Sequence, residues 1–65
     1  MEKIKQYQMV RLVRGVPDEG IEPGTQAVVL EVFDDDAFEI EVADDEGRTL
    51  YEGSVSRSDI EPLPS

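Results

Sequence analysis

Carboxylates are the groups in this chain best placed to do chemistry, because eight of them fall between residues 34 and 46 with no basic residue among them. They form an acidic triplet, an alternating pair of glutamates and a second triplet. In order they are Asp34, Asp35, Asp36, Glu39, Glu41, Asp44, Asp45 and Glu46. Carboxylates can catalyse proton transfer, hold a divalent cation or attract a basic partner.

Catalysis is the use that the composition supports least. The chain has neither His nor Cys, which removes the commonest general base and the most reactive nucleophile. A catalytic carboxylate pair needs one buried member with a raised pKa, whereas these acids fall on expected turns and on the wet side of a strand. We expect no enzyme and no catalytic residue.

A metal site is the second use. Ca²⁺ takes six to eight convergent oxygen ligands, and neither triplet has the Asp-x-Asp-x-Asp-Gly spacing that wraps a loop around the ion. The two triplets should also lie at opposite ends of the strand between them. We therefore expect no metal and no other cofactor.

The charge is unevenly distributed along the chain. Six Lys and Arg against sixteen Asp and Glu give a net charge of -10 over 65 residues. Residues 1–14 carry four bases against one acid, a net of +3, and the other 51 residues carry two bases against fifteen acids, a net of -13. If the basic first strand lies beside the acidic hairpin, the asymmetry is partly compensated. Otherwise the acidic face stands free to steer basic partners.

Size and composition bound the class of protein. A chain this short forms one small domain with a thin core, and its negative charge argues against nucleic acid as a ligand. The absence of Cys favours the cytoplasm. No apolar run approaches the roughly 20 residues of a membrane span, and no signal peptide follows the charged start.

Alternation of apolar and polar residues predicts strands rather than helices. In residues 37–43, Phe38, Ile40 and Val42 should point inward, and Glu39 and Glu41 outward. The other expected strands span residues 6–14, 25–33, 48–55 and 60–63, with turns at 34–36 and 44–47.

The remaining segments complete the expected fold. The Gly- and Pro-rich residues 15–24 predict a long irregular loop, and residues 56–59 a single helical turn. Gly53 is a candidate bulge or bend. We expect one all-β domain over residues 1–65, a small SH3-like five-stranded barrel with frayed ends at 1–5 and 64–65.

Residues 16–63 resemble a family of short bacterial proteins catalogued as domain of unknown function 4926. The similarity is carried by a Pro-acid-acid-Gly loop, Gly24-Thr25 before a Val-rich strand, the run Phe-Glu-Ile-Glu-Val, an acidic turn ending in Gly-Arg-Thr-Leu, and Asp59-Ile60. At position 27 the chain has Ala where family members often carry Gly. The resemblance implies an SH3-like barrel of unknown role, from mobile and toxin-antitoxin-like gene neighbourhoods, with no catalytic residue to carry over.

Two functions fit these features. The first is a protein-protein interaction module whose hairpin, residues 31–46 with the eight acids above, binds a basic partner such as a nuclease toxin or another nucleic-acid-binding protein. The second is a structural barrel that homodimerises, with charge serving solubility. The second expected strand suggests this dimer, because it has apolar residues on both faces: Val29 and Phe33 lie on the face away from Val28, Leu30 and Val32. The dimer would form through that apolar strand face. A proline-rich peptide groove is disfavoured, since the chain has four aromatic residues and no Trp.

Overall fold

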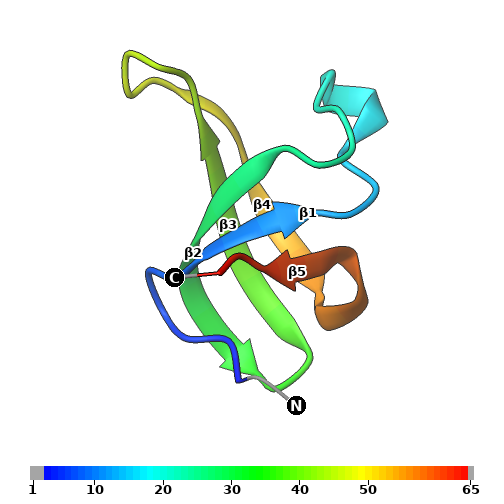
Figure 1. Ribbon diagram of the computed structural model, residues 1–65, viewed down its shortest axis with the longest axis vertical. Coiled ribbons are helices and arrows are strands. Elements are labelled where there is room, and N and C mark those ends of the chain that lie inside the picture. Colours follow the sequence, from blue (N-terminus) through cyan, green and yellow to red (C-terminus); the bar gives the residue numbers. More distant parts are fainter. Residues whose placement is uncertain (1–2, 65) are drawn as a thin grey trace.

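The computed structural model describes residues 3–64, which form one antiparallel sheet. Its elements are β1 (Met9–Leu12), η1 (Pro17–Glu19), β2 (Gln26–Asp34), β3 (Ala37–Ala43), β4 (Thr49–Ser56), η2 (Arg57–Asp59) and β5 (Ile60–Pro62). The strand order is β4-β3-β2-β1-β5, and the strands curl around a shared core (Figure 1). The all-β fold, the long first loop and the helical turn before the last strand are confirmed. None of the described helices is long and apolar enough to cross a membrane.

β3 has the bounds and the alternation that its sequence predicts. Phe38, Ile40 and Val42 are buried, while Glu39 and Glu41 are partly exposed on the other side. Its two neighbours, β2 and β4, make the longest ladders of the sheet. β3 therefore supplies the centre of the core and presents its glutamates outward.

The predicted faces of β2 are wrong. Ala27 and Val29 are the buried residues, whereas Val28 and Leu30 are half-buried and Val32 is 38% exposed. The ladder between β2 and β3 is interrupted by two bulges, and each bulge adds an unpaired residue that shifts the alternation. The unpaired residues are Leu30 and Phe33, so the bulges bring Val32 opposite the buried Phe38. Val29, which precedes both bulges, packs inside the domain and leaves the face that was expected to drive dimerisation.

β1 is shorter than the predicted strand at 6–14. Tyr7 has a φ of +68°, which breaks the extended backbone before β1 begins. Its N–H still donates to the carbonyl of Val29, at 2.6 Å, so the segment stays beside β2. Ile4, in the segment expected to fray, is 5% exposed and belongs to the core. Met1, Glu2 and Ser65 lie outside the described residues.

β4 is continuous at Gly53, so the bulge predicted there is wrong. Gly53 pairs regularly with Ile40, and the irregularity lies instead at Leu50, which is left unpaired between Thr49 and Tyr51. A side chain at position 53 would collide with the ring of Tyr51. Gly53 therefore makes room for that ring to pack against the core.

The core is closed at one end by the long loop. Ile21 is buried and Val16 packs against the core, where a backbone bridge joins the two. The other buried residues come from the strands and the N-terminal segment; they are Ile4, Val10, Leu12, Ala27, Val29, Phe38, Ile40, Val42 and Ile60. Closure into an SH3-like barrel stays a prediction, because the ladders join β4 and β5 to one neighbour each.

Candidate functional site

The outer face of the sheet carries four glutamates on three adjacent strands. Glu31 of β2 lies directly opposite Glu39 of β3, and Glu41 of β3 lies directly opposite Glu52 of β4. Side chains of directly paired residues lie about 5 Å apart at their Cβ atoms, on the same side of the sheet. We call these residues, Glu31, Glu39, Glu41 and Glu52, the glutamate face.

This arrangement is electrostatically unfavourable. Like charges directly opposite each other destabilise a strand pair, and no base lies within ion-pair distance of any of the four carboxylates among residues 3–64. Two of the four accept hydrogen bonds from β4 hydroxyl groups, Glu39 from Ser54 at 3.2 Å and Glu41 from Thr49. These bonds orient the carboxylates and leave their charge in place.

The N-terminal arginines pair elsewhere. Arg11 of β1 meets Glu61 of β5 at 2.9 Å, and Arg14 meets Asp59 of η2 at 3.4 Å. Both contacts lie on the β5 side of β1, away from β3 and β4. β1 does lie beside β2 of the hairpin, yet neither arginine pairs with the glutamate face, whose four carboxylates keep their charge.

Acids in the two hairpin turns have structural roles. In the β2–β3 turn, an Asp34 carboxylate oxygen accepts the N–H of Asp36 at 2.7 Å. In the β3–β4 turn, Asp44 accepts the N–H groups of Glu46 and Arg48, both at 2.9 Å. Such bonds are why Asp favours turns. Arg48 also pairs with Asp44 at 3.3 Å and with Glu46 at 2.9 Å, which neutralises part of the second turn.

The eight candidate acids therefore do not form one site. The two turns lie at opposite ends of β3, and only Glu39 and Glu41 join a continuous face. Asp35, Asp36 and Asp45 are exposed on the turns. The sequence prediction missed Glu52, because the unpaired Leu50 shifts the register and brings Glu52 opposite Glu41. Glu31 was the first residue of the predicted hairpin but was not named as a binding residue. Its position in the predicted strand at 25–33 could have indicated that it faces a residue of the next strand.

The burial and grouping of the acids are as follows. No charged or polar side chain is buried among the described residues, and none of their acids gathers in groups of three that could hold a metal ion. The pKa of Asp59 is lowered, chiefly by the hydrogen bond from the Ser56 backbone N–H and further by the Ser56 hydroxyl and Arg14. That carboxyl caps η2.

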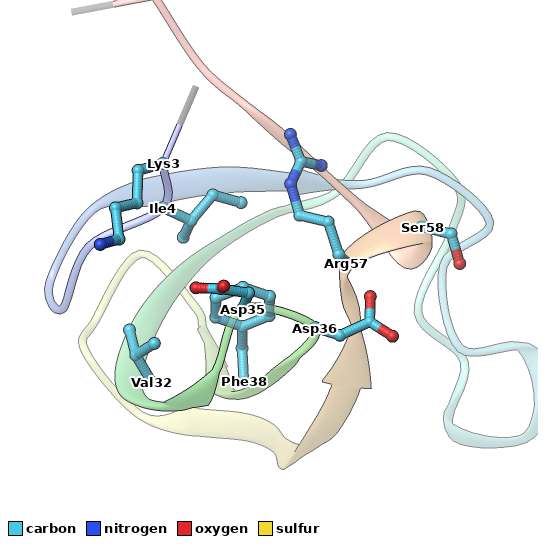
Figure 2. A pocket seen from close by; sticks show the side chains of 8 residues that line it. All are labelled: Lys3, Ile4, Val32, Asp35, Asp36, Phe38, Arg57 and Ser58. Carbon is cyan, nitrogen blue, oxygen red and sulfur yellow. The ribbon is translucent and has the colours of Figure 1, made fainter. Parts of the chain in front are cut away.

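A pocket of about 610 Å³ opens beside the β2–β3 turn (Figure 2). Lys3 and Arg57 contribute positive charge to its walls, and Asp35 and Asp36 contribute negative charge. Phe38 also lines it but is only 2% exposed, so little aromatic surface is available to a ligand. With both signs of charge around it, the pocket selects no simple class of ligand, and the glutamate face is the stronger candidate.

Together, these features define a small acidic domain of five antiparallel strands with an uncompensated carboxylate face. The chain belongs to the family Domain of unknown function (DUF4926), whose sequence profile matches residues 6–62. No curated protein and no solved structure matches the chain.

Proposed function

We propose that this protein is a non-catalytic interaction module that binds a basic protein through the glutamate face. The observation that carries the proposal is the pairing of Glu31 with Glu39 and of Glu41 with Glu52. A free domain loses stability by placing like charges directly opposite each other. A partner that supplies Lys or Arg turns the same arrangement into binding energy and selectivity.

Apolar side chains beside the glutamates support a protein partner. Met9 of β1 is paired with Val28 of β2, and Val28 with Glu41 of β3, so the three share one row across the outer face. Met9 is 43% exposed and Val28 is half-buried. Interfaces bind through apolar contacts at their centre with charge around them. The row offers both.

The partner class that fits best is a toxin or another protein that itself binds nucleic acid. Such a protein carries basic side chains that contact phosphates, and a fixed row of carboxylates presents negative charge to the same side chains. The exposed acids of the two turns, Asp35, Asp36 and Asp45, extend the negative field and speed encounter. The antitoxin-like role and a cytoplasmic location are part of this proposal.

The experiment starts from the tagged protein in its native cell. Proteins captured with it are identified by mass spectrometry, and the association rate of the main partner is measured across NaCl concentrations. Glu39→Lys/Glu41→Lys should slow association at least about tenfold, and raising NaCl from about 0.05 to 0.5 M should do the same to the unchanged protein.

The matched control is Asp18→Lys/Glu19→Lys. It makes the same change in charge on exposed residues of η1, far along the chain from the glutamate face. This variant should bind nearly as fast as the unchanged protein. A partner whose association ignores both salt and the β3 substitutions would refute the proposal.

Homodimerisation has less support than at the outset, because Val29 packs inside the domain. Of the two residues expected on the dimerising face, only Phe33 remains exposed, at 54%, and its ring alone is far from the roughly 800 Å² per partner of a stable interface. Sedimentation at micromolar concentration should give a monomer.

A further inference from the structure

The sheet has two edges, and they are built differently. β5 is three residues long and ends at Pro62, and short strands and Pro are two devices that protect an edge. β4 is eight residues long, contains no Pro and pairs with β3 only. Among residues 3–64, no backbone–backbone hydrogen bond beyond that ladder involves β4, and the Ser56 N–H at its end donates to the Asp59 carboxylate. β4 is the open edge of the sheet.

We propose that the β4 edge takes up an extended segment of the basic partner as an added strand. The inference rests on the proposed function and names the mode of binding and the kind of segment. Main-chain hydrogen bonds along an open edge supply affinity in this mode, and alternate side chains supply selectivity.

The outward side of β4 determines which side chains the added segment should carry at every second position. Glu52 faces outward beside Glu41 of β3, and Ser54 faces outward beside Glu39. A strand added to β4 would place every second side chain on this same side, about 5 Å from its β4 neighbour. Lys or Arg at those positions would extend the row of Glu41 and Glu52 with an opposite charge.

The inward side of β4 determines the side chains at the remaining positions. Tyr51 and Val55 of β4 face the core and pack against it, yet both stay only partly buried. They are paired with the fully covered Val42 and Phe38 of β3. The inward side chains of an added strand would lie next to Tyr51 and Val55, where apolar residues complete the burial. The segment therefore alternates basic with apolar residues.

A second copy of this chain fits the edge poorly. Each copy carries a net charge of -10, and antiparallel pairing of two β4 strands would bring two glutamate faces together. Like-charge juxtaposition of this kind opposes association. Charge complementarity favours a basic partner.

A synthetic peptide of about ten residues that alternates Lys with Val and Thr is a suitable probe. A second peptide with the same composition, but with its Lys residues and its apolar residues in separate blocks, keeps the charge and removes the pattern. Backbone NMR titration and amide hydrogen exchange locate binding on the full chain. The alternating peptide should bind at least about tenfold more tightly than the blocked one. It should also slow exchange of amides within residues 51–55.

Glu52→Lys is the diagnostic variant, with Glu19→Lys as its control for net charge. Glu52→Lys should weaken binding of the alternating peptide at least about fivefold. Glu19→Lys should change the binding free energy of the same peptide by less than half as much. Amide spectra of both variants show whether the sheet is intact, and Glu52→Gln removes the charge where Glu52→Lys fails to fold.

Three results would overturn the inference: no binding of the alternating peptide, equal binding of the two peptides, or binding without protection of β4. Self-association of the free chain through β4 would overturn it too. Equal binding of both peptides with shifts confined to the outer face would leave the proposed function standing. Failure of that function shows separately, in partner association that ignores Glu39→Lys/Glu41→Lys.

Discussion

Gly15 starts the long loop in a conformation that a side chain disfavours. Its φ is +66°, and a Cβ atom there would lie 2.6 Å from the backbone carbon of Glu22 and 2.7 Å from the nitrogen of Pro23. Gly15→Ala should therefore lower the free energy of unfolding by about 2 kcal/mol or more, from left-handed strain and the backbone clash together. Urea denaturation measures the loss.

Gly20 provides the comparison. Its φ is +72°, but nothing lies within 4 Å of the Cβ position. Gly20→Ala should cost only the strain, about 1 kcal/mol. Equal losses at the two positions would show that the backbone around Gly15 moves aside freely.

Residue type also separates the acids that appear equivalent in the sequence. Asp34 and Asp44 hold their turns through hydrogen bonds to backbone N–H groups, whereas Glu39 and Glu41 point outward from a strand. The short Asp side chain reaches its own backbone, and it is common in turns for that reason. The acidic hairpin therefore contains turn-forming aspartates and, separately, two residues of the glutamate face.

At the scale of an element, η2 depends on one carboxylate. Asp59 accepts the Ser56 backbone N–H at 3.1 Å and the Ser56 hydroxyl at 3.0 Å, and Arg14 lies 3.4 Å away. These contacts hold the pKa of Asp59 below its ordinary value of 3.8, with the backbone bond first among them and partial burial opposing. The folded state therefore favours the charged carboxylate.

Asp59→Ala should accordingly destabilise the domain by about 1 kcal/mol at pH 7, the usual cost of a lost cap. Because the pKa is lowered by folding, the contribution is complete above pH 3.8 and disappears as the pH falls through the folded-state pKa. Chemical denaturation at pH 7 and at about pH 2 should show the difference between variant and unchanged protein shrinking in acid. A difference independent of pH would assign the whole effect to uncharged contacts.

The pairing of β2 with β3 gives a prediction of opposite sign. Glu31→Lys replaces a like-charge pair with an attractive one, since Glu31 lies opposite Glu39. The free domain should gain about 0.5 to 1 kcal/mol, while association with the basic partner slows. Glu19→Lys makes the same charge change without a cross-strand acid and should gain less. If the two variants are equally stable, the cross-strand repulsion is negligible.

The elements differ in how far their sequences determined them. Residues 37–43 predicted β3 and its faces fully, because strict alternation and a turn at each end leave one register that buries the apolar side. β2 was placed correctly but its faces were not, because its two bulges arise from pairing with β3. The same limit hid Glu52, whose partner depends on the unpaired Leu50. The sequence of one strand is enough to predict that the strand forms. A bulge depends on how two strands pair, so it cannot be predicted from the sequence of either strand alone.

Over the whole molecule, the ion pairs redistribute charge without balancing it. Arg11, Arg14 and Arg48 account for the four ion pairs among residues 3–64, and their partners lie on β5, η2 and the β3–β4 turn. Exposed pairs of this kind contribute little to stability. The four carboxylates of the glutamate face therefore still repel one another, and the excess of acids over bases leaves the whole chain with a net charge of -10.

Added NaCl should therefore stabilise the free domain. Screening shortens the reach of repulsion from about 30 Å at 0.01 M to about 4 Å at 0.5 M, and self-repulsion is what opposes the compact state of a highly charged chain. We expect the melting temperature, followed by circular dichroism at pH 7, to rise by several degrees over this range. Sulfate is avoided, because it stabilises proteins by exclusion from their surface. Glu31→Lys should show a smaller rise than the unchanged protein, since part of its repulsion is already removed. A melting temperature that stays flat would mean that the three arginines neutralise the acids locally and that the glutamate face carries too little field to steer a partner.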